Sequence, residues 1–282
     1  MNILVTGGSG FIGSHVVDKL VDSGHKVRIL DIKKPYQKDI EFLEGSITSR
    51  ADIKRSLSGI QTVYHIAAFS NIDLVKDHPI ETIEQNIMGT AYLLEESRWQ
   101  KISRFIFASS VYAYEEKGHL YTTSKIASES LCKNYWTLYS LPYTILRYGT
   151  AYGPRSRGAD VISLFVRRAL KGENLVIRGS GEQKRHFTYV EDLARGSVAA
   201  LQSVAENKTY ALANKEAVSI KQLAEMIRGI FDNKIDIGFE AAREEDYQEK
   251  LADLDKARNE LGWEPEIDIR EGIRKYIEWY QQ

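Results

Sequence analysis

The chain has 282 residues, 43% of them apolar, which is enough to bury one large hydrophobic core or one core and a smaller lobe. Its 38 Lys and Arg residues are balanced by 39 Asp and Glu residues, and the resulting net charge of -1 provides no overall field to hold a nucleic acid. The single cysteine, Cys132, excludes an internal disulfide, and a start without a signal-peptide pattern or a membrane-length apolar run indicates a cytoplasmic protein with no membrane partner.

Short runs rich in β-branched and aromatic residues predict strands through the first half of the chain. These runs lie at residues 2–6, 26–31, 40–45, 62–67, 104–109 and 143–148. Apolar residues that recur at intervals of three and four predict helices at residues 11–24, 80–97 and 124–139. Because strands that alternate with helices form parallel sheets with helices on both faces, we expect an α/β, doubly wound (Rossmann) fold.

The regular alternation ends near residue 150. Gly-rich turns follow at residues 153–158 and 178–183, with short helices near 190–203 and 218–230. We therefore predict a dinucleotide-binding domain over residues 1–150 and a smaller C-terminal α/β lobe over residues 151–282, with interleaved segments that return to the core. Since no flexible linker separates the two parts, the cleft between them is the expected binding site.

A glycine-rich loop follows the first predicted strand, and its glycines are Gly7, Gly10 and Gly13. Glycines at this spacing allow a tight turn, a close approach of the backbone to a pyrophosphate and close packing of the following helix, whose N-terminus attracts the anion. Asp31 ends the second predicted strand, where a carboxylate can bind the ribose hydroxyls of NAD and repel the 2′-phosphate of NADP. NAD is therefore the expected cofactor, although Lys33 and Lys34 could accommodate a phosphate.

Tyr121 and Lys125 form the one Tyr–Lys pair at a spacing of four residues in the chain. On a helix this spacing places both side chains on one face, where the ammonium can lower the pKa of the phenol. A pair of this kind also arises by chance. Its position after the predicted strand 104–109, which leads into Ser110, favours a functional reading, because the carboxyl ends of strands line the ligand crevice in such sheets.

Several segments resemble, in the same order, the extended short-chain dehydrogenase/reductase family, in particular its NAD-dependent epimerase/dehydratase branch that acts on nucleotide sugars. The resemblance rests on TGGSGFIGSH (6–15), HIAA (65–68), Asn86 followed by GT (89–90), FASS (107–110), YTTSK (121–125), LRYGTAYGPR (146–155), GSGEQKRHFTYVEDLA (179–194) and DLDKARNELGWEP (253–265). It covers nearly the whole chain.

The resemblance implies a role for each matching residue. Tyr121 becomes the acid/base, Lys125 its partner and a ribose contact, and Ser110 the hydroxyl that orients the substrate, with Ser109 as a bystander. The implied cofactor contacts are Gly7, Gly10, Phe11, Ile12, Gly13, Asp31, Ile32, Ile47, Ile66, Ala67, Ala68, Asn86, Tyr121 and Lys125. The implied substrate contacts are Ser110, Thr150, Arg185 and Arg243, the two arginines binding the diphosphate. An ungapped alignment from FASS favours Tyr114 as the tyrosine of the family's Val-Tyr pair, and another register favours Tyr112.

Three positions depart from the family's usual pattern. Only ten residues separate Ser110 from Tyr121, where relatives carry a longer loop that shapes the substrate pocket. Ser46 replaces a frequent Asp that contacts adenine, and Thr150 replaces a common Asn. The short segment prevents transfer of a particular substrate, whereas the changes at Ser46 and Thr150 leave the chemistry in place. Histidines 65 and 186 and Cys132 are best explained as packed or locally hydrogen-bonded residues, and we expect no metal site.

The intact set of Ser110, Tyr121 and Lys125 favours an NAD-dependent nucleotide-sugar epimerase, similar to UDP-glucose 4-epimerase, that works by transient oxidation to a keto-sugar. The alternatives are a dehydratase or decarboxylase, whose relatives carry an acid just beyond the active hydroxyl, a dehydrogenase or ketoreductase, and a non-catalytic NAD-binding protein. Apolar residues in the helices near 81–97 and 122–139 also lead us to expect a homodimer.

Overall fold

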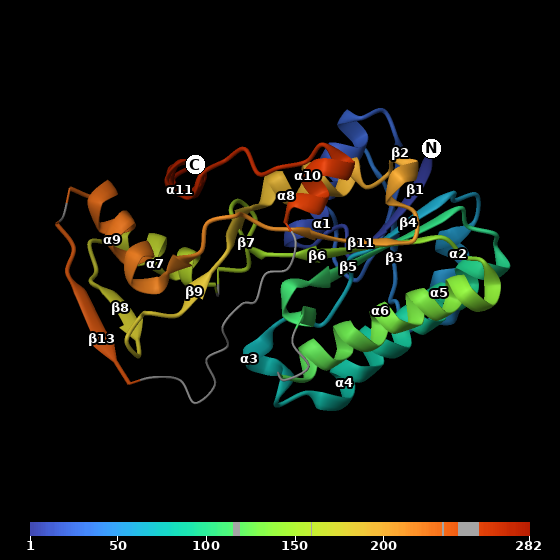
Figure 1. The fold of residues 1–282 in the computed structure, drawn as a ribbon, viewed down its shortest axis with the longest axis horizontal. Coiled ribbons are helices and arrows are strands. Elements are labelled where there is room, and N and C mark those ends of the chain that lie inside the picture. The colour runs from blue at the N-terminus through green and yellow to red at the C-terminus, as the bar shows by residue number, and fades with distance from the viewer. Residues whose placement is uncertain (115–118, 159, 233, 242–253) are drawn as a thin grey trace.

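The protein is built on a parallel sheet with the strand order β11-β6-β5-β4-β1-β2-β3 (Figure 1). The structure is a computed structural model and describes residues 1–114, 119–158, 160–232, 234–241 and 254–282. The strands of the sheet are β1 (Asn2–Thr6), β2 (Lys26–Asp31), β3 (Glu41–Glu44), β4 (Thr62–His65), β5 (Arg104–Ser110), β6 (Tyr143–Tyr148) and β11 (Lys208–Leu212). All of its strand pairs are parallel, which confirms the predicted doubly wound fold.

Two strands of the sheet differ from the sequence-based prediction by more than one residue at an end. Strand β4 ends at His65 because the N–H groups of Ile66 and Ala67 both donate to the carbonyl of Thr6, at 3.1 and 3.0 Å, so the chain leaves the ladder there. Strand β11 was not predicted. It comes from the second half of the chain and pairs with β6, so this segment returns to the sheet edge.

Helices cover both faces of the sheet (Figure 1). On one face lie α1 (Phe11–Asp22), α8 (Val190–Ala199) and α10 (Asp255–Leu261), which pack on side chains such as Ile3 and Val5. On the other face lie α2 (Arg50–Leu57), α5 (Gly89–Trp99) and α6 (Leu120–Tyr139), which pack on Leu4 and Phe105. Successive β1 residues therefore face opposite helical layers, as the period of two in a strand requires.

The helix predicted at residues 80–97 forms as three consecutive pieces. These are α4 (Pro79–Ile83), a π-helical turn η1 (Glu84–Met88) and α5. The wider turn contains Asn86, whose carbonyl accepts hydrogen bonds from the hydroxyls of Thr90, at 2.6 Å, and Ser128, at 2.9 Å. Since such turns redirect side chains locally, the π turn explains how Asn86 comes to face helix α6.

Elements from the second half of the chain form a second lobe beside the sheet, on the left of Figure 1. Three short turns connect other elements of the described chain. The lobe contains β7 (Thr150–Tyr152), α7 (Val161–Leu170), β8 (Leu175–Arg178), β9 (Lys184–Arg185), β10 (Phe187–Tyr189), β12 (Val218–Ser219), α9 (Ile220–Ile230), β13 (Ile237–Glu240) and α11 (Ile269–Tyr280). The short turns are α3 (Ile72–Val75), η2 (Val111–Tyr114) and η3 (Ser203–Ala205). The domain boundary at residue 150 stays a prediction.

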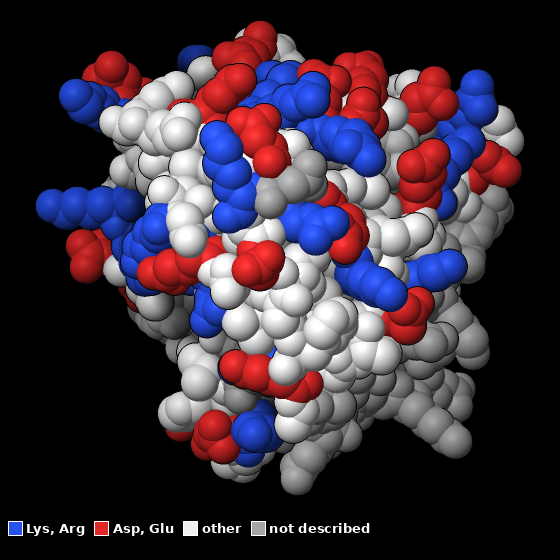
Figure 2. Space-filling model, turned by 90° about the vertical axis from the view of Figure 1, so that its left-hand side faces the viewer, with Lys and Arg blue, Asp and Glu red and all other residues white. Residues whose placement is uncertain are grey.

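The second lobe has its own hydrophobic cluster, in which Val166, Leu223 and Ile273 are fully buried. Its outer face carries Lys and Arg side chains interspersed with Asp and Glu (Figure 2). The two signs of charge therefore alternate over this face and form no single-sign patch there. Over the described residues, no helix combines the length and apolar character needed to cross a membrane.

Candidate active site

The loop between β1 and α1 is shaped by glycines that no other residue could replace without movement. Gly7 has a φ of +72°, and a Cβ there would lie 2.6 Å from the backbone nitrogen of Ala67. A Cβ on Gly13 would lie 2.0 Å from the carbonyl oxygen of Gly7. The N–H of Gly10 donates to that same carbonyl, at 3.0 Å, and closes the turn directly before Phe11 and Ile12 begin helix α1.

The loop presents groups that suit a pyrophosphate. The N-cap residue of α1 is Gly10, which has no side chain to cap the first N–H groups, so these donors and the positive end of the helix dipole stay available to an anion. The hydroxyl of Ser9 is buried and has no hydrogen-bond partner among the described residues. A buried, unpaired donor beside a helix N-terminus fits the phosphates of a dinucleotide.

Asp31 is held in a fixed orientation at the end of β2. Its Oδ2 accepts a hydrogen bond from the N–H of Ser9, and its Oδ1 accepts one from the N–H of Lys33, both at 3.0 Å. The carboxylate is partly exposed and can accept further hydrogen bonds, so it fits a ribose diol. Ile32 next to it is 67% exposed, and the neighbouring Lys33 and Lys34 are exposed as well.

The other predicted cofactor residues lie along the same edge of the sheet. Ile47 packs on Gly89 of α5, where a Cβ would lie 2.9 Å from the Ile47 Cδ1. Ile66, Ala67 and Ala68 follow β4 beside the glycine loop, and Ala68 is half-buried. Asn86 is fully engaged within the protein: its Oδ1 accepts from the N–H of Phe69, and its Nδ2 donates to the carbonyl of Phe69 and to the hydroxyl of Ser124.

Ser110, Tyr121 and Lys125 meet where β5 ends and α6 begins. The His119 Nδ1 caps α6 by accepting from the N–H of Thr122, at 3.2 Å, so Tyr121 lies in the first turn of the helix. The Ser110 hydroxyl accepts from the N–H of Tyr112, at 3.3 Å, and lies near enough to the Tyr121 phenol to lower its pKa. Lys125 lies 5.6 Å from the centre of the Tyr121 ring and donates to the Ala108 carbonyl at 2.7 Å. The structure therefore brings together the three residues predicted to carry the chemistry.

Burial dominates the ionisation of these groups. It raises the pKa of the Tyr121 phenol, an effect that the nearby Tyr112 phenol increases, while Arg157 and the Ser110 hydroxyl lower it. Burial lowers the pKa of Lys125 to about 8, while the negative charge of Glu129 raises it. The expected lowering of the phenol pKa by Lys125 is therefore not met in this structure, because desolvation outweighs it and Arg157 is the cation that acts on the phenol.

Tyr112 and Tyr114, which the sequence left as alternatives, occupy different surroundings. The Tyr112 ring lies 5.6 Å from the His119 ring, which in turn lies 5.7 Å from that of Tyr121. Tyr114 instead lies under the guanidinium of Arg147, at 4.2 Å. Tyr112 is thus the tyrosine on the Tyr121 side.

Arg157 was not predicted to belong to the site. It lies in the Gly-rich loop after β7 and donates from Nη1 to the Ser70 hydroxyl, at 3.2 Å. Ser70 lies five residues after the end of β4, and the Arg157 charge is close enough to lower the pKa of Tyr121. A charged residue in an exposed Gly-rich loop carries no periodic signal, so only the tertiary structure reveals its position.

The predicted substrate residues lie at the start of the second lobe. Thr150 begins β7 and pairs with Phe187 of β10. Arg185 lies in β9, two residues before Phe187, and its Nη1 donates to the carbonyl of Lys184 at 2.9 Å. Arg243 lies outside the described residues. Thr150 and the Arg185 segment therefore approach each other through the β7–β10 pair.

The residues with simple structural explanations behave as predicted. His65 is buried between the hydroxyls of Thr6, at 2.8 Å, and Thr90, at 2.9 Å, and burial lowers its pKa to about 3. His186 bonds to the carbonyl of Asn214, and Cys132 is buried. Within the described residues, no three His, Cys, Asp or Glu side chains are grouped as a metal site would require.

The fold and these side chains define a dinucleotide-binding protein with a Ser–Tyr–Lys site at the carboxyl edge of its sheet. More particularly, the chain belongs to the NAD dependent epimerase/dehydratase family, whose model matches residues 3–213.

Similar proteins span the chain from end to end. A Methanocaldococcus jannaschii protein provisionally named UDP-glucose 4-epimerase is 34% identical, over 98% of this chain and 97% of that protein. The crystal structure of UDP-glucose 4-epimerase from Thermotoga maritima, solved with UDP-glucose, has a TM-score of 0.93 and 31% identity, covering 100% of this chain and 99% of that one. UDP-N-acetyl-alpha-D-glucosaminuronate decarboxylase of Bacillus cytotoxicus is 30% identical, over 99% of this chain and 97% of that protein.

Proposed function

We propose that the protein is an NAD-dependent epimerase of nucleotide sugars. The observation that carries this proposal is the meeting of Ser110, Tyr121 and Lys125 at the end of β5, on the same sheet edge as the glycine loop and Asp31. The family match and the similarity to UDP-sugar epimerases over the full chain support it. Val111 and Tyr112 follow Ser110, where eliminating relatives carry an acid, which favours epimerisation over dehydration or decarboxylation.

In this proposal the residues of the chain handle protons and orientation. The glycine loop and Asp31 hold NAD, which supplies a reversible hydride acceptor. Ser110 orients the reacting sugar hydroxyl, and Tyr121 removes its proton. Because burial raises the pKa of the phenol, the phenolate needs a cation beside it; Arg157 lowers the phenol pKa, and Lys125 lies 5.6 Å from the centre of the ring. Tyr121 would return the proton to the carbonyl oxygen once the keto-sugar has turned and taken the hydride back on its other face, so no net oxidation occurs.

We assign recognition of the substrate to the side of the site that the second lobe forms. Thr150 contacts the sugar, and Arg185 and Arg243 bind the diphosphate, for which a planar guanidinium is well suited. Arg157 favours a second candidate, a nucleotide-activated uronic acid, because a guanidinium beside Tyr121 and Ser70 could pair with a sugar carboxylate. A UDP-glucuronate 4-epimerase of Thermodesulfobacterium geofontis is 29% identical over 99% of this chain.

The experiment incubates purified protein and NAD separately with UDP-glucose, UDP-galactose and UDP-glucuronate and follows the anomeric signals by proton NMR. We expect interconversion at one sugar carbon with no net formation of NADH. A 4-keto product, release of carbon dioxide or stoichiometric NADH would each overturn epimerisation in favour of dehydratase, decarboxylase or dehydrogenase activity. Turnover of UDP-glucuronate alone would select the uronic acid.

We also propose that the protein is a homodimer located in the cytoplasm. Exposed apolar side chains lie on α4 and α6, among them Ile80, 62% exposed, and Leu138, 68% exposed. Burying such groups against a second copy would be favourable. Sedimentation at micromolar concentration should show a dimer, and a monomer would refute this part. The buried free thiol of Cys132 is compatible with a reducing compartment.

A further inference from the structure

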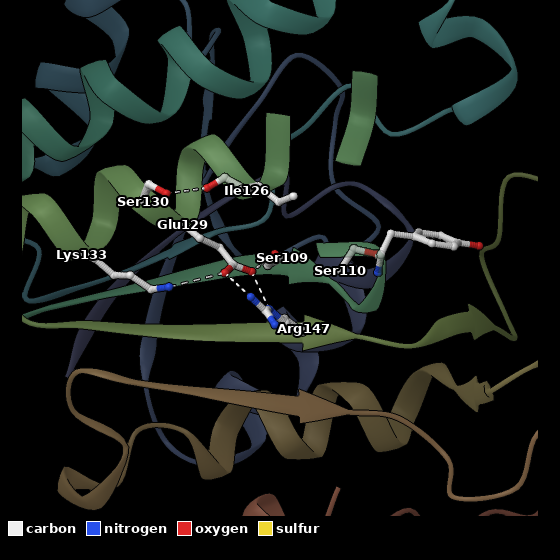
Figure 3. Close-up of polar contacts among 8 residues, drawn as sticks. Ser109, Ser110, Ile126, Glu129, Ser130, Lys133 and Arg147 are labelled. Atoms are coloured by element: carbon white, nitrogen blue, oxygen red, sulfur yellow. Dashed lines mark hydrogen bonds and ion pairs between the residues drawn. The ribbon is translucent and has the colours of Figure 1, made fainter. Parts of the chain in front are cut away.

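An ion pair between a buried glutamate and a partly buried arginine lies next to the reacting residues. Glu129 is on α6, one turn after Lys125, and only 2% of it is exposed. Its carboxylate accepts two hydrogen bonds from the guanidinium of Arg147 on β6, at 2.8 and 2.6 Å (Figure 3). Because isolated buried charges are costly, this two-point contact makes the burial of Glu129 possible.

The same carboxylate holds the strand that carries Ser110. The Ser109 hydroxyl donates to the Glu129 Oε1 at 2.6 Å (Figure 3). Ser109 is also the residue of β5 that lies in register with Arg147 of β6. The Glu129 side chain therefore links α6 to β5 and β6. The link lies next to Ser110, which follows Ser109 in β5, and one helical turn from Lys125.

The carboxylate also faces the charge of Lys125. The groups that act on Lys125 come from every element packed around it: Tyr121, Glu129 and Cys132 on α6, His65 on β4, and on β5 the Phe107 ring and the Ala108 carbonyl. Burial raises the pKa of the Cys132 thiol and lowers that of His65 to about 3, so both are neutral near pH 7. Among these described groups, Glu129 is the one carboxyl group, and it acts on Lys125 in the direction opposite to burial.

We propose that Glu129 is a positioning residue for the reaction, which fixes the Ser110 end of β5 against α6 and keeps Lys125 positively charged inside the protein. Its part in the reaction rests on the proposed function, whereas its effect on the charge of Lys125 does not. A purely structural brace would also explain the hydrogen bonds, but it would leave the titration of Lys125 unchanged when the charge alone is removed.

The first test measures the titration of Lys125 directly, in protein labelled with ¹⁵N at the lysine Nζ, with the signal assigned by its absence in Lys125→Arg. Burial lowers the pKa of Lys125 to about 8 and Glu129 opposes that shift, so removing the negative charge should lower the midpoint further. We expect Glu129→Gln, which keeps the side-chain size, to shift it down by about one pH unit. Lys133→Met is the matched control, because Lys133 is an exposed cation 4.0 Å from the same carboxylate. An unchanged midpoint in Glu129→Gln would overturn the proposal.

The second test measures turnover against pH with NAD and the UDP-sugar that the wild type converts. Glu129→Gln should move the alkaline limb of kcat to lower pH, because Lys125 loses its proton sooner, while KM changes little. Ser109→Ala removes one hydrogen bond and no charge, so it should lower kcat about 3- to 10-fold with an unshifted limb. Glu129→Asp, which restores the charge, should restore the limb.

The outcomes remain separable if one variant or one assumption fails. Should Glu129→Gln not fold, Glu129→Asp and Ser109→Ala carry the test, and wild-type kcat in Ser109→Ala would overturn the positioning role. If no UDP-sugar is converted, the proposed function fails. The ¹⁵N titration still decides whether Glu129 controls the charge of Lys125.

Discussion

The side of the site formed by the sheet and α6 (the sheet side) is built differently from the side formed by the second lobe (the lobe side). On the sheet side, Lys125, Glu129 and Ser110 are buried; Lys125 and Glu129 are hydrogen-bonded to strand β5, and the Ser110 hydroxyl accepts from the N–H of Tyr112 in the turn η2. On the lobe side, Thr150 and Arg185 are only half-buried and lie in strands of three and two residues. The groups that carry the chemistry are therefore held more rigidly than those that select the substrate.

The difference suggests how one scaffold serves several reactions. Buried hydrogen-bonded groups cannot change without a large loss of stability, whereas half-exposed residues on short strands can. The relatives fit this division, since proteins named as a UDP-sugar epimerase and a UDP-sugar decarboxylase are both 30% or more identical to the chain over nearly its full length. We therefore expect chemistry to depend on the sheet side and substrate choice on the lobe side.

The largest effect should come from Tyr121→Phe, which removes only the hydroxyl. If that hydroxyl transfers the proton, kcat should fall about 10²- to 10⁴-fold with little change in substrate affinity or unfolding free energy. Tyr139→Phe is the matched control, because Tyr139 is an exposed tyrosine at the other end of the same helix. Near-normal turnover of Tyr121→Phe would show that Tyr121, on the sheet side, does not transfer the proton.

His65, which is buried in the sheet, should make the unfolding free energy of the protein sensitive to acid. Its pKa is lowered from 6.5 to about 3 in the folded protein, so below pH 6.5 the unfolded chain binds a proton that the native protein does not. The unfolding free energy should therefore fall as the pH drops from about 6.5 towards 3, by about 1.4 kcal/mol per pH unit from this residue.

Urea denaturation at pH 7, 6, 5 and 4 measures this dependence. His65→Gln should lose the His65 contribution to the slope, whereas His78→Gln, at an exposed position, is the control. Equal slopes in wild type and His65→Gln would show that the buried histidine is not a source of acid sensitivity.

Asp31→Ala should change cofactor selection. Losing the carboxylate removes hydrogen bonds to the ribose diol and the repulsion of a 2′-phosphate, so NAD affinity should fall about 10-fold or more while NADP affinity rises. Calorimetry with both cofactors measures the ratio, and Asp22→Ala, an exposed acid at the end of α1, is the control. A wild-type preference for NADP would contradict the assignment.

The smallest effect should come from Arg185→Ala on the lobe side. A half-exposed guanidinium contributes modestly, so KM for the UDP-sugar should rise about 3- to 10-fold while kcat stays within about two-fold. Arg178→Ala, in β8 of the same lobe, is the control. A fall in kcat as large as that of Tyr121→Phe would contradict the proposal that the sheet side carries the chemistry and the lobe side selects the substrate.

The local sequence predicted much of the sheet side. The β-branched runs, the spacing of Gly7, Gly10 and Gly13, and the Tyr121–Lys125 interval all report on neighbours in the chain, because strand pleat, tight turn and helical face repeat over a few residues. For the same reason the six predicted strands of the first half formed, whereas β11, which is paired only with β6 at the edge of the sheet, was missed.

The sequence by itself determined the fold class, the cofactor loop and which residues could carry the chemistry. Only the tertiary structure decided that Arg157 faces Tyr121, that Glu129 and Arg147 form an ion pair next to Ser110, and that burial rather than Lys125 controls the phenol pKa. Desolvation and the approach of charges distant in sequence depend on the packed chain as a whole, and no local pattern encodes them.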